Sequence, residues 1–182
     1  MVYMLLADGF EEIEAIAPLD ILRRAEIEAG TVSLTSDLYV RGGHDIIVKA
    51  DIALEQIDFA SMEVLVLPGG GVGVDTISGN PDAMDLVMQT WIAGKKIAAI
   101  CAAPALLATL NILDGRDVIC HPSVTDEVAA AGGKVQEGHM VVFDHNLVTG
   151  IAAGASIDFG LGLVSALRGK EASELLRGKL SP

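Results

Sequence analysis

The chain has 182 residues, with 12 lysines and arginines against 25 aspartates and glutamates, which gives a formal net charge of −13. This balance argues against a protein that binds nucleic acid or an anionic membrane, because both need a basic face to meet phosphates. Hydrophobic residues make up 51% of the chain, too many for a disordered protein. The 2 cysteines cannot build a disulfide framework, so we expect a reducing, cytoplasmic compartment in which either thiol is free to react.

The length suits one domain over residues 1–182 that is large enough to bury a core. The longest apolar runs, Ile97–Leu113 and Ile151–Leu167, contain polar residues or proline and fall short of the roughly 20 residues of a membrane-spanning helix. No basic segment opens the chain, so we expect no signal peptide. We therefore expect a soluble protein whose apolar residues cover a buried sheet and a subunit interface.

The first elements alternate between strand and helix patterns. Val2–Leu6 is predicted to be a buried strand, and the acidic stretch after it opens a helix that we expect to run to about Ala29, with Gly30 as its stop signal. Pro18 must lie early in this helix or kink it. Thr31–Ser36 is predicted to be a second strand.

The same alternation continues to the end of the chain. A small hairpin is expected where two apolar segments flank residues 41–44. Asn80 is expected to cap a helix that begins at Pro81. The further predicted segments, in chain order, are Leu38–Val40, Ile46–Val48, Val64–Leu67, Pro81–Thr90, Ile97–Ile100, Ala102–Leu110, Val118–Ile119, Thr125–Ala131, Met140–Phe143, Leu147–Thr149 and Gly154–Leu167.

Apolar strands that alternate with helices predict an α/β fold with a mostly parallel sheet covered on both faces. In such a sheet, sites form beyond the carboxyl ends of the strands. Five loops follow strands in this way and hold most of the reactive side chains; they are Ala7–Glu14, Pro68–Gly71, Cys101 with Ala102, His121 with Pro122, and Gly150–Ala153. This coincidence predicts a site at one edge of the sheet.

Cys101 lies directly between a predicted buried strand and a predicted helix. Free N–H groups and the helix dipole would point at its sulfur, lower its pKa and favour the reactive thiolate. The N–H of Ala102 would also face an oxyanion formed there. The alternative is that Cys101 is a small buried hydrophobe, the commoner role of a cysteine.

Other candidate site residues lie in the predicted loops after neighbouring strands and at the start of the first helix. The N–H of Gly70, in the glycine run 69–71, would be a second oxyanion donor if that loop lies beside Cys101. Three acids open the first helix, and one that points into the crevice would have a raised pKa, whereas the others would complement the helix dipole. His121 is either a general base or a hydrogen-bonded residue at a strand end. Cys120 is expected to be packed or half-exposed, and His44 to be solvated. The cysteine and histidine spacing contains no zinc signature, so we expect no metal.

The motifs together resemble the ThiJ/PfpI superfamily, in the branch of the parkinsonism-associated protein deglycase and its bacterial relatives. The resemblance covers nearly the whole chain and rests on the segments Leu6–Glu14, Leu67–Gly71, Ala98–Pro104 and His121-Pro122. It implies a flavodoxin-like three-layer sandwich that forms a homodimer and needs no cofactor. Two departures are Ala103, where relatives commonly carry glycine, and His44, near which the pocket arginine of some relatives falls.

Position by position, the resemblance implies catalytic roles for Cys101, Glu14 and His121. Cys101 matches the nucleophile, and Glu14 matches the protonated acid bonded to its sulfur. The oxyanion donors match the N–H groups of Gly70 and Ala102. Residue 102 is not histidine, which argues against the peptidase-like PfpI branch, and a missing late His-x-Glu pair weakens a glutamine amidotransferase.

The resemblance implies a small carbonyl substrate: processing of methylglyoxal and glyoxal to 2-hydroxy acids, or of early glycation adducts of proteins. The alternative is a redox-sensing stress chaperone that uses reversible oxidation of Cys101. A binding module that has lost the chemistry is a third reading. The presence of acid, thiol and glycine loop together disfavours it.

Overall fold

The structure is a computed structural model that describes residues 1–180. Its main sheet has seven strands in the order β10-β11-β7-β6-β1-β2-β5. Every neighbouring pair is parallel except β10 and β11, which form an antiparallel hairpin at one edge. The strands are β1 (Val2–Leu6), β2 (Ala29–Ser33), β5 (Ile52–Ala53), β6 (Val64–Leu67), β7 (Lys96–Ile100), β10 (Val141–Asp144) and β11 (Leu147–Gly150). The predicted mostly parallel sheet is therefore confirmed.

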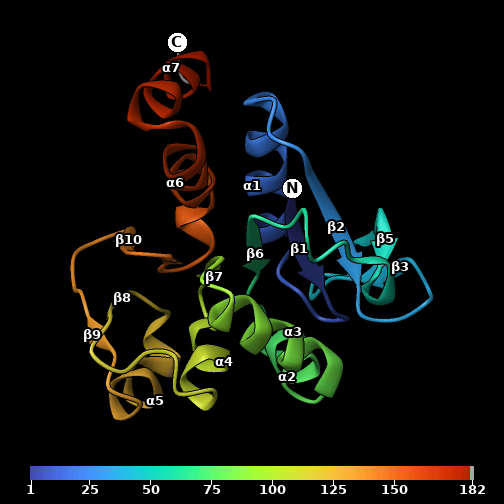
Figure 1. Cartoon of the computed structure of the whole chain (residues 1–182), viewed down its shortest axis with the longest axis horizontal. Helices are drawn as coiled ribbons and strands as arrows, with labels where there is room; N and C mark the ends of the chain where they lie inside the picture. Colours follow the sequence, from blue (N-terminus) through green and yellow to red (C-terminus); the bar gives the residue numbers. More distant parts are fainter. Residues whose placement is uncertain (181–182) are drawn as a thin grey trace.

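Helices cover both faces of this sheet, as expected for a flavodoxin-like sandwich (Figure 1). On one face lie α1, α6 and α7, and on the other lie α2, α3, α4 and α5. Their bounds are α1 (Glu12–Arg24), α2 (Gly71–Ser78), α3 (Pro81–Ile92), α4 (Pro104–Thr109), α5 (Thr125–Ala130), α6 (Ser156–Arg168) and α7 (Lys170–Leu180). Among residues 1–180, none of these helices combines the length and apolar character needed to cross a membrane.

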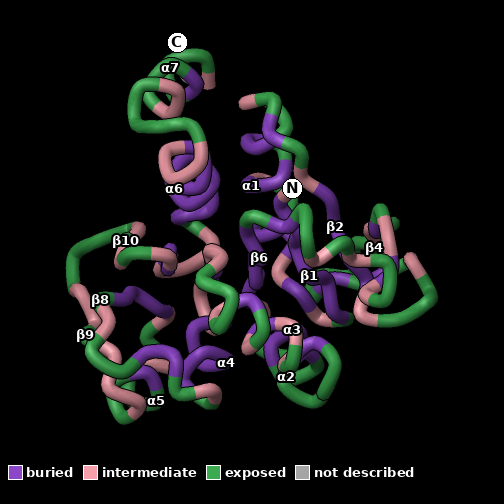
Figure 2. The backbone as a smooth tube through the Cα atoms, in the orientation of Figure 1, coloured by how far each residue is buried: buried purple, intermediate pink, exposed green. Residues whose placement is uncertain are grey.

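Alternate strand residues serve the two layers, because successive side chains of a strand point to opposite faces. In β1, Leu5 packs against the α2–α5 layer, whereas Met4 and Leu6 pack against α1 and α6. All three side chains are fully buried. In Figure 2 the residues coloured as buried lie along the central strands and along much of α1 and α6. Such two-sided burial explains why the central strands are continuous apolar runs.

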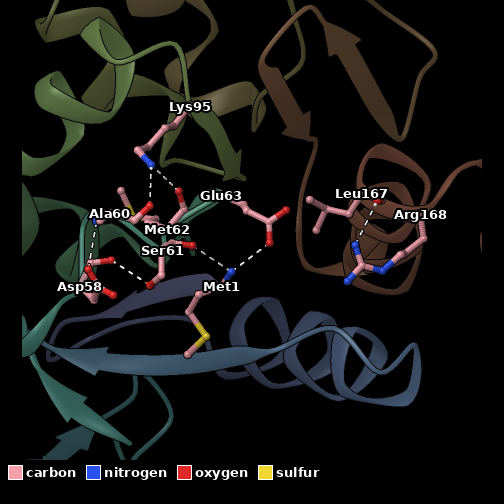
Figure 3. Close-up of polar contacts among 9 residues, drawn as sticks. All are labelled: Met1, Asp58, Ala60, Ser61, Met62, Glu63, Lys95, Leu167 and Arg168. Carbon is pink, nitrogen blue, oxygen red and sulfur yellow. Dashed lines mark hydrogen bonds and ion pairs between the residues drawn. The ribbon is translucent and has the colours of Figure 1, made fainter.

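At the amino ends of the central strands, polar contacts join the segments that precede β1, β6 and β7 (Figure 3). The N-terminal amine of Met1 donates to Glu63 Oε1 at 2.9 Å and to the Ser61 carbonyl at 3.1 Å. Lys95 Nζ donates to the Met62 carbonyl at 2.6 Å and lies 5.0 Å from the centre of the Phe59 ring. These contacts align the strand starts at the edge opposite the candidate site.

Two smaller sheets lie outside the main one. The expected hairpin around residues 41–44 is confirmed, with antiparallel β3 (Tyr39–Arg41) and β4 (Ile47–Lys49). β8 (Asp117–Val118) pairs with β9 (Lys134–Val135). Three short 3-10 helices, η1 (Leu54–Gln56), η2 (Pro122–Val124) and η3 (Ala153–Ala155), complete the described chain.

The predicted end of the first helix is wrong. α1 ends at Arg24, and Gly30 lies inside β2 rather than stopping a helix. The register of the parallel pair explains the difference, because Ala29 and Gly30 are opposite Val2 and Tyr3 and complete the ladder with β1. Pro18 lies in the middle of α1, not in its first turn.

Helix α1 packs closely on α6 at this proline. A Cβ on Gly160 of α6 would lie 2.9 Å from the Pro18 Cα and 2.9 Å from the Ile21 Cδ1, so only glycine fits there. Two helices were not predicted: α2 begins within the glycine run and resembles a turn in sequence, and α7 is mostly polar. The predicted cap of α3 is confirmed, because the Asn80 side chain accepts the Ala83 N–H at 3.0 Å.

Candidate active site

The loops after β1, β6, β7 and β11 meet at the carboxyl edge of the sheet, where these four strands are neighbours. Backbone hydrogen bonds hold them together: the Cys101 N–H donates to the Gly150 carbonyl at 2.9 Å, the His121 N–H donates to the Cys101 carbonyl at 2.8 Å, and the Glu11 N–H donates to the Gly69 carbonyl at 3.0 Å. Four of the five predicted loops therefore follow strands of the main sheet at one edge, whereas the loop at His121 follows β8 of a separate two-stranded sheet and reaches this edge through its bond with Cys101.

Cys101 is a strained elbow between β7 and α4. Its φ is +64°, in the left-handed region that residues with a Cβ rarely adopt, at a cost of about 1–2 kcal/mol. Strain of this kind persists where the surrounding structure imposes it, often at functional sites. Ala103, where relatives commonly carry glycine, has an ordinary helical φ of −61° and is fully buried, so its methyl group fits without strain.

Glu14 lies beneath the cysteine and is fully buried. Its Oε2 accepts the Gly69 N–H at 2.8 Å. Its Oε1 has no hydrogen-bond partner of normal geometry among residues 1–180, although the Cys101 thiol is close enough for each group to shift the pKa of the other. Burial raises the pKa of Glu14 to about 7, against the lowering effect of the nearby Cys101 thiol and of the bond from the Gly69 N–H.

The predicted lowering of the thiol pKa is wrong while Glu14 is ionised. Burial, followed by the charge and hydrogen bond of Glu14, raises the pKa of Cys101 to about 12. The N–H groups of Ala102 and Gly70 lower it, but by less. The prediction rested on these N–H donors and did not include the negative charge of the neighbouring carboxylate. Because two buried like charges repel, the pair favours carrying a single negative charge.

The two N–H groups expected to hold an oxyanion both lie near the sulfur, where they lower the pKa of the thiol. They come from Gly70, with φ +90°, and from Ala102. A Cβ on Gly70 would lie 2.7 Å from the Glu11 nitrogen, so the glycine run allows the loop after β6 to approach the loop after β1. The structure thus brings together Cys101, Glu14 and both donors.

His121 reaches the site through its backbone, and its ring bonds Ser123. Nδ1 lies 2.8 Å from Ser123 Oγ and accepts the Ser123 N–H at 3.2 Å. This bond assigns the ring proton of neutral His121 to Nε2. Among residues 1–180, no hydrogen bond joins the His121 ring to the cysteine. The ring is half-buried.

Glu12 points away from the cysteine and holds the β3–β4 turn. Its carboxylate is 7% exposed, accepts the His44 N–H at 2.7 Å and lies 2.8 Å from His44 Nδ1. His44 was expected to be solvated; its ring is exposed, but its N–H and Nδ1 are held by the Glu12 carboxylate. A Cβ on Gly42 would lie 2.6 Å from Glu12 Cγ, so glycine is needed against this carboxylate.

The same cluster places ligand atoms of Glu11, Glu12 and His44 within 4.8 Å of one another, which a metal ion requires. Hydrogen bonds already account for the arrangement. Glu12 bonds His44, and Glu11 Oε2 caps α1 by accepting the Glu14 N–H at 2.8 Å. The cluster is therefore a hydrogen-bonded clamp on the loop that carries Glu14.

Cys120 is packed rather than half-exposed. It is 2% exposed, and its sulfur lies 3.8 Å from Thr125 Oγ1. Burial raises the pKa of its thiol. Two functional contacts were not predicted from the sequence: the Gly69 N–H bond to Glu14 and the Glu12–His44 contact. The glycine run gave a signal for the first, but no local pattern links residues 12 and 44.

Comparison with known proteins identifies the family. The family model described as the DJ-1/PfpI family matches residues 1–166. The chain belongs to this family. The predicted resemblance and the flavodoxin-like fold are both confirmed.

Two relatives and one solved structure match along almost their whole length. The chain is 33% identical to protein dj-1beta of Drosophila melanogaster, over 97% of this chain and 95% of that protein. It is 30% identical to a protein of Schizosaccharomyces pombe named glutathione-independent glyoxalase DJ-1, over 93% of this chain and 92% of that protein. The solved structure of oxidized Toxoplasma gondii DJ-1 superposes with a TM-score of 0.91 at 29% identity, covering 98% of this chain and 96% of that chain.

Proposed function

We propose that the protein converts reactive 2-oxoaldehydes, such as methylglyoxal and glyoxal, to 2-hydroxy acids without a cofactor, using Cys101 as the nucleophile. The observation that carries this proposal is the strained Cys101 with two N–H donors at its sulfur and the buried carboxyl of Glu14 beside it. The name of the S. pombe relative supports the same reaction class. Early adducts of these aldehydes on proteins present the same carbonyl chemistry.

The reaction would begin with the thiolate of Cys101 in its state with protonated Glu14. Glu14 has its pKa raised to about 7 by burial, so it takes up a proton near neutral pH and then no longer opposes a charge on sulfur. Its carboxyl O–H would donate to the sulfur through the otherwise unpaired Oε1. In this state the thiolate of Cys101 accepts a hydrogen bond from the neutral carboxyl of Glu14, and the pair carries one negative charge.

The sulfur then attacks the aldehyde carbon, and the carbonyl π electrons move to oxygen. The N–H groups of Gly70 and Ala102, free of the thiolate charge, would stabilise this oxyanion. Transfer of the aldehyde hydrogen as a proton from the first carbon to the second oxidises the first and reduces the second. We assign this transfer to Glu14, which first gives its own proton to the oxyanion and then, as a carboxylate, carries the C–H proton from the first carbon to the second, with His121 as a second proton carrier.

The product of that step is a 2-hydroxyacyl thioester on Cys101. Water adds to it and the C–S bond breaks, which releases lactate from methylglyoxal or glycolate from glyoxal and restores the cysteine. The sum is one aldehyde plus one water to one hydroxy acid. The internal transfer between carbons needs no external oxidant or reductant.

Lactate formation from methylglyoxal by the purified protein tests this proposal. Cys101→Ser should lower kcat at least about 10³-fold, because it removes the nucleophile. Cys120→Ser is the matched control, since that buried thiol lies outside the site, and it should keep turnover once thermal unfolding shows that it is folded. Unchanged turnover in Cys101→Ser would refute the mechanism.

A second candidate function is redox sensing through Cys101, favoured by the oxidised state named for the T. gondii relative and by the partial exposure of this sulfur. Oxidation would place a sulfenate or sulfinate next to the same N–H donors. Peroxide titration with intact mass should then add oxygen at Cys101 before any other residue. Prior oxidation of methionines would exclude the sensor.

We also propose that the protein is a homodimer joined through α1 and α6. Isoleucines on these adjacent helices are exposed, with Ile13 56%, Ile16 39% and Ile157 54% accessible. Exposed apolar side chains on two helices that pack against each other are typical of an interface. Light scattering should give twice the mass of one chain, and Ile13→Glu with Ile157→Glu should give the monomer.

A further inference from the structure

A cavity of about 210 Å³ lies beside the two loops that carry the N–H donors. Gly71 and Ala102 line it, and these residues directly follow Gly70 and Cys101 in the chain. Ser123, which holds the His121 ring, lines it as well. The cavity therefore lies where the part of a substrate beyond its reacting carbonyl would extend.

The wall of this cavity is apolar, and its charge has one sign. Val74 and Leu106 are among the apolar residues that line it. Asp75 from α2 and Glu127 from α5 are its acidic residues, and no lysine, arginine or histidine of the described chain lines it. The other polar contributions are hydroxyls and backbone.

Neither carboxylate is neutralised by a neighbour. Within residues 1–180, Asp75 and Glu127 form no salt bridge and their side chains accept no hydrogen bond, whereas acids such as Asp51 and Asp158 pair with arginines. Both residues are exposed, so their field acts on the cavity through water, is screened by salt and is strongest at low ionic strength. The field adds to that of a chain with a net charge of −13.

We propose that Asp75 and Glu127 set the charge preference of this site, so that Cys101 reacts with neutral or positively charged carbonyl compounds in preference to anionic ones. The inference rests on the proposed function for its substrate, but the preference itself belongs to the cavity and acts on any reagent that reaches the sulfur. The charge preference favours aldehyde adducts on cationic amines or guanidines over aldehydes that carry a carboxylate or phosphate.

The preference is measured without turnover by labelling Cys101 with two methanethiosulfonates, one with a trimethylammonium-ethyl group and one with a sulfonatoethyl group. The thiolate displaces methanesulfinate from each reagent and forms a mixed disulfide, whose rate is followed by mass. The ratio of cationic to anionic rate, divided by the same ratio for 2-mercaptoethanol, reports the field at the sulfur. We expect a corrected ratio of about tenfold, at the lower end of electrostatic focusing, that decreases with added salt.

Asp75→Asn with Glu127→Gln should bring the corrected ratio to within about twofold of unity. The matched control is Asp82→Asn with Asp85→Asn, which removes the same charge from a separate cavity of about 450 Å³ beside α3. This control should keep most of the preference. A wild-type ratio near unity, or an equal loss in both double variants, would overturn the inference. So would failure of Cys101 to react with either reagent.

Enzyme kinetics provide a second test of the charge preference. kcat/KM should be about tenfold lower for 4-carboxyphenylglyoxal than for phenylglyoxal, and Asp75→Asn with Glu127→Gln should close this gap. If neither compound turns over while the labelling ratio behaves as expected, the proposed function fails and the charge preference of the sulfur stands. If both turn over equally well, the charge preference fails and the proposed function stands.

Discussion

Glu14 and Cys101 meet across the backbone of Gly69. A Cβ on this glycine would lie 2.5 Å from Glu14 Oε2 and 2.8 Å from the Cys101 Cβ. The acid and the thiol therefore approach each other only because residue 69 has no side chain. The same glycine donates its N–H to the acid, so it provides both the space and a hydrogen bond.

Gly69→Ala should separate this pair and destabilise the protein by about 1–3 kcal/mol, the usual cost of overpacking a buried site. Gly71→Ala is the control, because a Cβ there meets nothing within 4 Å, and its free energy of unfolding should stay close to that of the wild type. Urea unfolding measures both. Equal stability of Gly69→Ala and the wild type would show that the loop shifts freely.

Glu14→Gln should separate thiol reactivity from turnover. The amide removes the negative charge that raises the pKa of Cys101 and keeps an N–H donor beside the sulfur, so alkylation by iodoacetamide near pH 7 should be retained or faster. Lactate formation should decrease about 10²–10⁴-fold, because glutamine cannot carry a proton. Wild-type turnover in Glu14→Gln would rule out Glu14 as the proton carrier.

Glu14 should also make stability depend on pH. Burial raises its pKa from 4.5 to about 7, so between these values the folded state binds more protons than the unfolded state, and stability falls as pH rises. Relative to Glu14→Gln, the wild type should lose about 3 kcal/mol between pH 4.5 and pH 8. Urea titrations at several pH values test this. A difference between the two proteins that stays constant with pH would contradict the raised pKa.

The Glu12–His44 contact should stabilise the β3–β4 turn in a limited pH range. The hydrogen bond and the charge of Glu12 raise the pKa of His44. The pKa of Glu12 is lowered: burial tends to raise it, but the hydrogen bonds from His44 outweigh burial. The contribution of His44 to stability is full below pH 6.5 and is lost as the pH rises through the folded pKa of His44. The contribution of Glu12 to stability is full above pH 4.5 and is lost as the pH falls through the folded pKa of Glu12. The pair is thus strongest between about pH 4.5 and 6.5.

His44→Ala should therefore accelerate hydrogen exchange of the Gly43 amide, which donates to the Phe10 carbonyl at 2.8 Å, most strongly near pH 6. His139→Ala, an exposed histidine outside the hairpin, is the control and should leave this amide unchanged. Exchange at Gly43 that is equal in the wild type and His44→Ala would refute the clamp.

Gly160→Ala should weaken the packing of α1 on α6 by about 1–3 kcal/mol, because the added methyl would overlap Pro18 and Ile21. Gly178→Ala in α7 has open space around the new Cβ and should instead stabilise by about 0.5–1 kcal/mol through helix propensity. Thermal unfolding compares the two. A stabilised Gly160→Ala would contradict the close helix contact.

The position of the reactive loops after strands and the elbow at Cys101 were predictable because they follow from local pattern. Continuous apolar runs identify buried parallel strands, and the carboxyl ends of such strands lie at one edge. The resemblance to a known family selected Glu14 among three acids, a choice that helical spacing alone left open. The end of α1 was not predictable, since pairing with β1 extends β2 through Gly30.

The sequence by itself determined the chemistry available at the sheet edge: a thiol, a set of acids, a histidine and a glycine run. Only the tertiary structure decided how these groups act on one another. The pKa of Cys101 depends on the depth of burial and on a carboxylate 87 positions earlier in the chain. Likewise, Asp75 of α2 and Glu127 of α5 line one cavity only in the folded chain. Electrostatic energy depends on distance and dielectric environment, and a linear pattern contains neither.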